Sequence, residues 1–344
     1  MKSLHAIWLS LGLACAAAAP AAAQTPLFSE NAEVELLIEA PIGTITRNAR
    51  RNTDPHPGTI TAVESGVVFP IELSARGLSR RTRGWCRFPP LRLDIEGDGR
   101  RGTLFQGQNR LKIVTRCNSD DLVALEMLAY RLYNEITPYS YRVRPAQITY
   151  RDSDRGRDDT QFNFLIEDVD DVARRNDRVE IDVMAGEIRA AQLDPAAAAR
   201  YALFQFMIGN LDWDMVTARP GEECCHNSRL LAASETARNA LIPAPYDFDF
   251  SGLVNAPYAG PPPQVPINDI RTRYYRGYCM HNDQLPAAIA HFQARRGALN
   301  AAIATAPRLS DRARRSAQRY VDGFFELIAD AGDVERQIIR RCRS

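Results

Sequence analysis

The 344-residue sequence predicts an α+β fold with two lobes, a strand-rich N-lobe with one helix and a mainly helical C-lobe. Three observations support this fold class. Up to residue 168, most structured segments are short and rich in β-branched and aromatic residues, as strands are. Only one segment of that half has helical periodicity, whereas helical patterns dominate afterwards. With 45% hydrophobic and 25% charged residues, the composition is that of a globular protein.

The N-lobe is expected to cover residues 24–168. Its predicted strands are residues 34–38, 67–74, 91–95, 111–115, 141–150 and 162–166. Its helix is predicted over residues 121–136, because Ser119 or Asp120 can cap the start and Pro138 prevents continuation. The C-lobe, residues 169–344, is expected to contain helices over 195–208, 286–304 and 310–329. The long polar stretch between the first two, residues 209–283, is predicted to be functional, as long loops in compact domains usually are.

The first 23 residues have the features of an export signal. Lys2 precedes a short apolar run, and Ala21-Ala22-Ala23 offers a cleavage site. Lipidation at Cys15 is a minor alternative, because Gly12 stands where a lipoprotein signal usually has Leu. No later segment approaches the run of about 18 apolar residues that a membrane span needs. The mature protein is therefore expected to be periplasmic or secreted, without a transmembrane segment.

The charge of the chain excludes a general nucleic-acid binder. The formal net charge is +1, so no strong positive field surrounds the protein. Local basic runs, such as residues 80–83, are expected to lie on solvated faces.

Six cysteines remain after the predicted cleavage, and an even number in an oxidising compartment indicates disulfides. Cys86 and Cys117 are the preferred pair, because both close β-type segments of one region. Cys224 and Cys225 are adjacent, and each is expected to pair with a distant partner. The absence of a C-x-x-C motif gives zinc or thioredoxin-type chemistry no support.

The first group of candidate site residues contains Lys112 and Glu126. The mature chain has one lysine, Lys112, against 41 arginines, which indicates a position that needs a compact ammonium. A lysine on a strand can bind the phosphates of a nucleotide when a carboxylate from a neighbouring helix holds its ammonium. Glu126 in the predicted helix is the expected partner, and Glu135 near the far end is the rival. A stray lysine and a surface glutamate are the alternative.

A second group follows the helix over 195–208. Asp212 and Asp214 are candidate catalytic residues, since a carboxylate on a loop can orient a substrate hydroxyl. Asn227 can help to bind a metal ion that carries phosphates, and His226 could be a base. Each aspartate alone is equally typical of a turn or a helix cap.

The third group is the run Tyr246-Asp247-Phe248-Asp249-Phe250. On a strand, Asp247 and Asp249 would point to one face and could together hold Mg²⁺. The flanking aromatic residues indicate that the run is buried, and buried carboxylates need a partner. A short strand that ends in a turn is the alternative interpretation.

The order of these groups is typical of protein-kinase-like phosphotransferases, which predicts that the two lobes are kinase-like. With these motifs, the chain resembles the CotH family of atypical secreted kinases, named for a spore-coat protein. The resemblance covers residues 67–252. It depends on Arg76-Gly77-Leu78-Ser79-Arg80, Leu111-Lys112-Ile113-Val114-Thr115-Arg116-Cys117, Glu126-Met127-Leu128-Ala129-Tyr130-Arg131-Leu132-Tyr133-Asn134, Gly209-Asn210-Leu211-Asp212-Trp213, His226-Asn227 and Tyr246-Asp247-Phe248-Asp249.

The resemblance implies a role for each matching residue. Lys112, together with Arg76, would bind ATP and Glu126 would orient Lys112, while Asp212 would be the catalytic aspartate, with Asp214 as its competitor. Asn227 with Asp247 or Asp249 would hold Mg²⁺, or Mn²⁺ in its place. The chain departs from ordinary protein kinases because 14 residues separate Asp212 from Asn227 and no Gly-x-Gly-x-x-Gly loop precedes Lys112.

The expected function is an exported, ATP- and Mg²⁺-dependent phosphotransferase that phosphorylates a hydroxyl on an envelope or secreted protein. Nucleotidyl transfer would use similar residues. A non-catalytic protein of the same fold, with a surface-binding or structural role in the envelope, is the main alternative. A metal-dependent hydrolase that uses the aspartates is the third.

Overall fold

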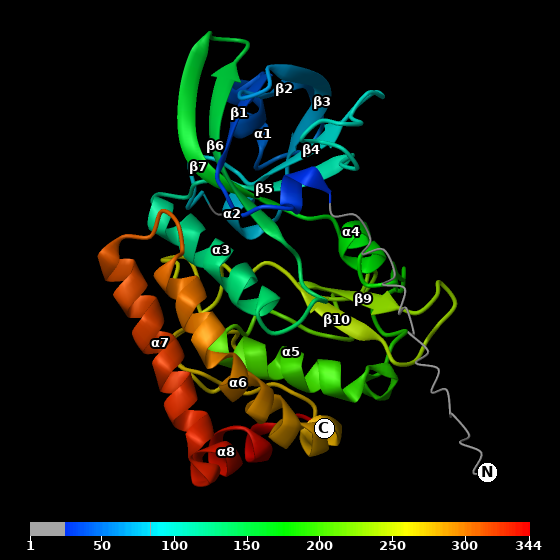
Figure 1. Cartoon of the computed structure of the whole chain (residues 1–344), viewed down its shortest axis with the longest axis vertical. Helices are drawn as coiled ribbons and strands as arrows, with labels where there is room; N and C mark the ends of the chain where they lie inside the picture. The colour runs from blue at the N-terminus through cyan, green and yellow to red at the C-terminus, as the bar shows by residue number, and fades with distance from the viewer. Residues whose placement is uncertain (1–24, 83) are drawn as a thin grey trace, which may run out of the picture.

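A computed structural model describes residues 25–82 and 84–344 (Figure 1). The predicted export signal, residues 1–23, lies outside the described residues. The strands are β1 (Val34–Ala40), β2 (His56–Ala62), β3 (Val67–Ala75), β4 (Leu91–Ile95), β5 (Arg110–Val114), β6 (Val143–Asp152), β7 (Arg157–Ile166), β8 (Val179–Glu180), β9 (Ser228–Ala232) and β10 (Ile242–Pro245). The α-helices are α1 (Ile42–Asn48), α2 (Ser79–Thr82), α3 (Asp120–Asn134), α4 (Val169–Arg174), α5 (Pro195–Ile208), α6 (Leu285–Ala304), α7 (Asp311–Ala329) and α8 (Ala331–Gln337).

Strands β1 to β7 form a closed barrel in the order β1-β2-β3-β4-β5-β7-β6. The closing pair is parallel, with Val34 of β1 opposite Ala146 of β6 and Ala40 opposite Asp152. The other neighbours in the barrel are antiparallel. Closure leaves no edge strand with unpaired backbone groups.

The predicted fold class, a two-lobed protein-kinase-like fold with one helix in a strand-rich N-lobe, is wrong. The strands close into a seven-stranded barrel, and α1 and α2 accompany α3. Closure depends on β1 and β6, which are far apart in the sequence, and local patterns carry no signal for such a pairing. The two additional helices are only 7 and 4 residues long, too short to show helical periodicity.

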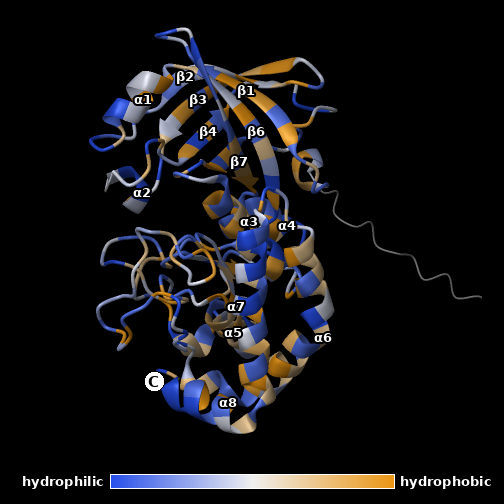
Figure 2. Ribbon diagram, turned by 90° about the vertical axis from the view of Figure 1, so that its left-hand side faces the viewer, coloured by the Kyte–Doolittle hydropathy of each residue, from blue (hydrophilic) through white to orange (hydrophobic). Residues whose placement is uncertain are grey.

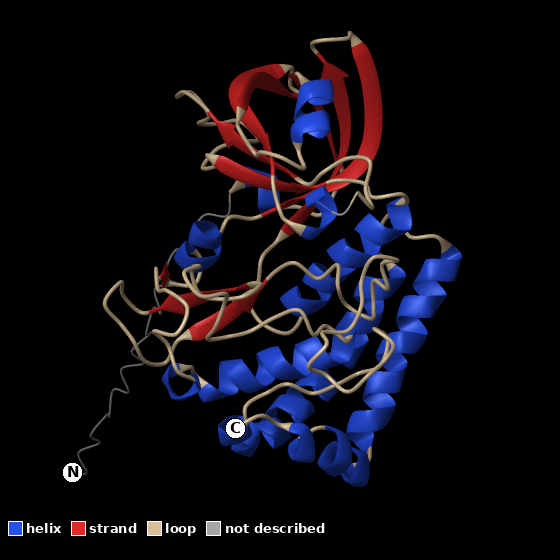
Figure 3. Cartoon of the chain, turned by 180° about the vertical axis from the view of Figure 1, so that it is seen from behind, coloured by secondary structure: helices blue, strands red, loops and turns tan. Residues whose placement is uncertain are grey.

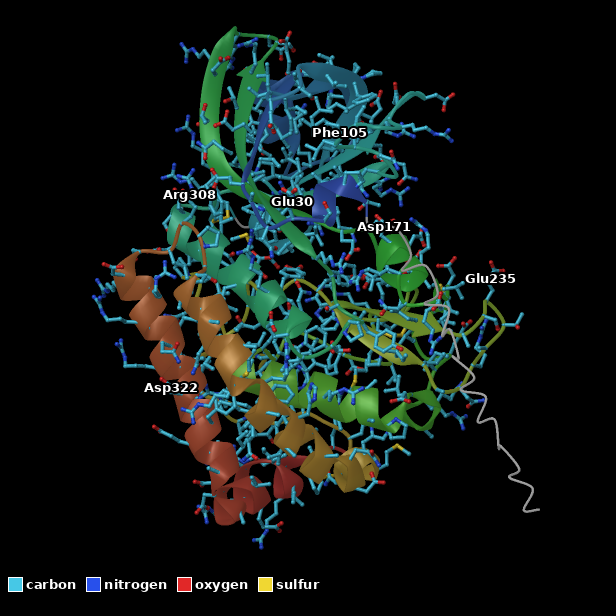
Figure 4. All side chains as sticks on the ribbon, in the orientation of Figure 1. Glu30, Phe105, Asp171, Glu235, Arg308 and Asp322 are labelled. Carbon is cyan, nitrogen blue, oxygen red and sulfur yellow. A yellow bond between two sulfur atoms is a disulfide. The ribbon has the colours of Figure 1, made fainter. Side chains whose placement is uncertain are left out.

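Hydrophobic and hydrophilic residues alternate along the barrel strands, as the banded colouring of the ribbon in Figure 2 shows. The buried apolar residues form the core of the barrel. Leu36, Ile38, Leu73 and Leu111 are at most 1% exposed. Phe105, labelled in Figure 4, packs edge-to-face against Phe69 at 5.9 Å between ring centroids. This apolar interior is a core of its own, distinct from the core among the helices.

The helical region is built around α5, which is buried over most of its length. Asp194 caps this helix by accepting a hydrogen bond from the Ala197 amide at 2.7 Å. Helices α6 and α7 pack against it, and β8, β9 and β10 form a small antiparallel sheet nearby. Long loops run between these elements (Figure 3). In the described part of the chain, no helix combines the length and apolarity required to cross a membrane.

The barrel and the helical region are joined by α3 and by ionic contacts. Arg308, labelled in Figure 4 between α6 and α7, pairs with Glu33 at 2.5 Å and lies 5.6 Å from the ring centroid of Phe162 in β7. These contacts fix the ends of the long helices against the base of the barrel.

Residues 25–82 and 84–344 contain three disulfides. Cys86–Cys117 confirms the preferred pair, and Cys279–Cys342 connects the segment before α6 to the C-terminal end. The prediction for Cys224 and Cys225 is wrong, since the two are bonded to each other. Steric preference alone could not show that this pair lies in a buried turn just before His226.

Candidate functional site

A cleft of about 380 Å³ lies beneath the barrel, beside α2 and α3. It brings together six of the eight predicted site residues, which come from five separate segments: Arg76, Glu126, Asp212, Asn227, Asp247 and Asp249. Lys112 and Asp214 do not line it. The long polar stretch predicted to be functional therefore contributes four of the six predicted residues, and eight of the lining residues in total, to one cavity.

Two loops of this stretch are held side by side. Gly209 ends α5 in the left-handed conformation, with φ of +63°, which redirects the chain toward the cleft. The Gly252 amide then donates to the Gly209 carbonyl at 3.0 Å, and Asn210 forms a β-bridge with Ser251. This backbone contact brings the loop with Asp212 next to the loop with Asp247 and Asp249.

Asp212 is the centre of a polar cluster at the cleft. Its Oδ1 lies 2.8 Å from His226 Nε2, and its Oδ2 accepts a hydrogen bond from Asn227 Nδ2 at 3.1 Å. The hydrogen bond to Asp212 raises the pKa of His226. The Asp212 side chain remains 37% exposed, so a substrate can reach it.

Asp214, the predicted competitor, lies elsewhere. It is 5% exposed and pairs with Arg343 Nη1 at 2.6 Å. Its Oδ1 also accepts hydrogen bonds from the amides of Val216 and Thr217. A carboxylate with these partners stabilises the loop and is not available to a substrate in the cleft.

The run with Asp247 and Asp249 does not form the predicted strand. Strand β10 ends at Pro245, and Asp247 adopts the left-handed conformation with φ of +64°. Tyr130 of α3 supports this conformation by accepting a hydrogen bond from the Asp247 amide at 2.8 Å. The turn nevertheless directs both carboxylates to the cleft.

The partner of Glu126 is Arg80 rather than Lys112. Arg80 binds Glu126 directly, and its Nε donates to Asp249 Oδ2 at 3.0 Å. At 8% exposure Arg80 is buried, so the prediction that this basic run lies on a solvated face is wrong for Arg80. Arg80 belongs to the Arg-Gly-x-Ser-Arg segment, residues 76–80. This motif was the signal in the sequence that could have marked Arg80 as a site residue, whereas the count of basic residues could not.

Lys112 lies near the cleft, on β5. Its ammonium is 5.2 Å from the ring centroid of Tyr246, which lines the cleft. Burial, followed by the Arg76 guanidinium, lowers the pKa of Lys112 to about 8. Among the described residues, neither Lys112 nor Arg76 forms an ion pair with a carboxylate.

The rival partner Glu135 lies outside this cleft and binds Arg295.

The carboxylates of the cleft are unequally paired with cations. Burial, then Asp249 and Glu126, raises the pKa of Asp247 well above its usual value. Glu126 and Asp249 share Arg80, whereas Asp247 has no ion-pair partner among the described residues. A divalent cation bound to Asp247 would favour the ionised form of this carboxyl.

The cleft residues could supply part of the coordination of a Mg²⁺ ion that also binds substrate phosphates. No group of three His, Cys, Asp or Glu residues in residues 25–82 and 84–344 could hold a metal ion alone. Mg²⁺ usually takes one or two carboxylates and completes its coordination with substrate phosphates. Asp247 and the Asn227 amide oxygen, on the same cleft, can supply this partial set.

No family model and no curated protein matches this chain. The chemistry of the cleft is therefore derived from its own residues.

Proposed function

We propose that the protein is an exported, Mg²⁺-dependent phosphotransferase that transfers the γ-phosphoryl group of ATP to a hydroxyl on an envelope or secreted protein. The observation that carries the proposal is the cleft itself, which is lined by several carboxylates, by the Asn227 amide and by Arg76. Among the described residues, Arg76 forms no ion pair with a carboxylate. These are the groups that phosphoryl transfer requires, because its catalysis consists mainly of positioning and charge neutralisation. The motifs shared with the CotH family of atypical kinases support the same activity.

The cations near the cleft have the character of a phosphate site. Arg76 lines the cleft. Lys112 lies close enough to Arg76 for the Arg76 charge to lower the pKa of Lys112. Two neighbouring cations without carboxylate partners repel each other, and an anion between or beside them relieves that repulsion. Arg76 would form charge-assisted hydrogen bonds with phosphate oxygens, and Lys112 would add a compact positive charge.

In the proposed step, the acceptor oxygen forms a bond with the γ-phosphorus, and the bond between that phosphorus and the β,γ-bridging oxygen breaks. Asp212 accepts the proton of the hydroxyl, and ADP leaves with the electron pair of the broken bond. His226 and Asn227 hold both carboxylate oxygens of Asp212 and so fix its orientation. Mg²⁺ held by Asp247 and Asn227 would neutralise phosphate charge.

Three disulfides support export, because such bonds persist mainly in oxidising compartments.

The test is incubation of the purified protein with γ-labelled ATP and Mg²⁺ or Mn²⁺, together with an envelope extract as acceptor. We expect label transfer by the wild type and its loss in Asp247→Asn. Asp98→Asn, at an exposed turn outside the cleft, is the matched control and should retain transfer. Equal labelling with all three proteins would contradict the proposal.

A non-catalytic binding protein is the second candidate, and one contact favours it. Arg80 occupies Asp249, which removes one carboxylate from the predicted metal site. This candidate predicts that ATP binds, with loss of affinity in Arg76→Ala, while no transfer occurs even in the wild type.

A further inference from the structure

A second hollow, of about 400 Å³, adjoins the cleft on the other side of Asp212. We call it the proline groove, because residues 261–263, three consecutive prolines, form part of its wall. Asp212 and Phe250 line both cavities. Phe250 packs against Tyr258 at 5.7 Å between ring centroids, and both rings line the groove.

We infer that the proline groove binds the acceptor, as an uncharged, extended polypeptide segment whose Ser or Thr hydroxyl reaches Asp212. This inference rests on the proposed function and deepens it, since it gives the protein acceptor a binding site and specifies an uncharged, extended segment. Asp212 stands between the two hollows, which is the place required of a group that must contact both the acceptor hydroxyl and the phosphate to be transferred.

The contrast in charge between the two cavities assigns their ligands. The cleft has arginines, a histidine and several carboxylates along its wall, as a highly charged ligand requires. The groove has one ionisable side chain that is charged at neutral pH, Asp212 itself. Its other lining residues are apolar, aromatic or neutral, so a charged segment would lose hydration there without gaining a partner.

The proline loop favours polypeptide as the class of acceptor. Proline has no backbone N–H, so residues 261–263 add no donor that would compete with a ligand. The Pro262 carbonyl already accepts a hydrogen bond from the Val265 amide at 3.0 Å, whereas no such bond is formed by the Pro261 and Pro263 carbonyls among the described residues. An extended peptide carries N–H groups at regular intervals and can donate to such carbonyls. Phe250 and Tyr258 supply the apolar surface against which its side chains would pack.

The test uses serine-containing peptides in three versions, in which the residues beside the serine are neutral, lysine or glutamate. Gln264→Glu places a negative charge at the exposed rim of the groove. Gln293→Glu makes the same change on the exposed surface of α6, outside both cavities, and is the matched control. Transfer from labelled ATP to each peptide and the affinity for ATP are measured for all three proteins.

We expect the wild type and Gln293→Glu to prefer the neutral peptides. Gln264→Glu should shift the preference toward lysine peptides by up to about fivefold, the effect of an exposed ion pair, without a change in affinity for ATP. If wild type phosphorylates peptides and both variants behave alike, the groove is not the acceptor site and the proposed function stands. Transfer to sugars or simple alcohols but to no peptide would overturn the polypeptide assignment. If the wild type neither binds ATP nor transfers phosphate, the proposed function fails and the inference falls with it.

Discussion

The cleft and a larger cavity at Glu30 both have charged walls, but they differ in how those charges are paired. The cleft beneath the barrel measures about 380 Å³, whereas a hollow beside Glu30, which Figure 4 labels, measures about 570 Å³. We call this cavity the rear hollow; it is lined by residues 28–31, by residues 134–143 in part, and by Arg175, His291 and Arg295. Both of its carboxylates have arginine partners, Glu30 with Arg144 and Glu135 with Arg295. Size and charge therefore do not identify the functional cavity.

The difference lies in what the charged groups have left to bind. In the cleft, Asp247 has no ion-pair partner among the described residues, and Asp212 is exposed toward both the cleft and the proline groove. In the rear hollow, Arg175 is committed to Glu167 and His291 to the Ile136 carbonyl. A buried charge without a partner has a cost in free energy, and that cost is relieved when the group takes up a proton or binds a ligand.

The largest effect on activity is expected for one of two neighbouring aspartates in the same loop. Asp212 lines the cleft, whereas Asp214 is held in an ion pair with Arg343. We expect Asp212→Asn to reduce phosphoryl transfer by about 100- to 10,000-fold, the usual contribution of a general base, with little change in stability. Asp214→Asn is the matched variant and should lower the melting temperature, because it leaves Arg343 without its carboxylate, while activity per folded molecule remains. Rates and thermal unfolding check both. Equal loss of activity in the two variants would mean that the loop acts as a unit and that Asp212 has no separate role.

In the rear hollow, the corresponding change should affect stability alone. Arg175→Met leaves the 3%-exposed Glu167 carboxylate without a charged partner, and breaking such a buried pair costs about 3–5 kcal/mol of unfolding free energy. Denaturant unfolding measures the loss, and affinity for ATP should be unchanged at temperatures where the variant is folded. A loss of ATP affinity with intact folding would show that the rear hollow binds the nucleotide.

The sequence predicted much of the secondary structure but not the closure of the barrel. Helix α5 matches its predicted range, because caps and periodicity are local signals. Strand β2 was missed, since Pro57 and Gly58 near its start are typical of turns. The pairing of β1 with β6 that closes the sheet depends on contacts between distant segments, which no window of sequence contains.

The candidate site shows the same division. Asp212, Asn227 and Asp247 could be singled out because carboxylates and amides with turn-forming neighbours stand out locally. The partner of Glu126 could not be predicted, because Arg80 reaches it only once α2 has been placed beneath the barrel. Lys112 was the conspicuous cation, yet its ammonium contacts Tyr246 instead.

A smaller effect is expected from Arg76, compared with a cation of the rear hollow. Arg76→Ala should weaken ATP binding by about 10- to 100-fold, since hydrogen bonds to charged groups contribute about 1.5–3 kcal/mol. Arg142→Ala is the control, because Arg142 is also half-buried and lines the rear hollow. Calorimetric titration with a non-hydrolysable ATP analogue measures both. Equal affinities in the two variants would remove Arg76 from the phosphate site.

The smallest effect is a pH dependence that Lys112 should give to the cleft. Burial lowers the pKa of Lys112 from 10.5 to about 8, and Arg76 is the next largest cause. Arg229 lowers this pKa further, while Asp168 and Glu180 oppose the shift. The ammonium is charged below pH 8, so ATP affinity should fall several-fold between pH 7 and pH 9. The unfolded chain binds more protons between pH 8 and 10.5, so the same group makes stability rise with pH there.

These opposite signs separate a functional lysine from general alkaline unfolding, which would lower affinity and stability together. Lys112→Met should bind ATP more weakly at pH 7 and lose the additional fall toward pH 9. Lys112→Arg keeps its positive charge throughout this range, so its affinity for ATP should not change between pH 7 and pH 9. Calorimetric titrations and denaturant unfolding at pH 7, 8 and 9 measure the two quantities. A wild-type affinity for ATP that stays constant from pH 7 to pH 9 would exclude Lys112 from the phosphate site and leave Arg76 as its cation.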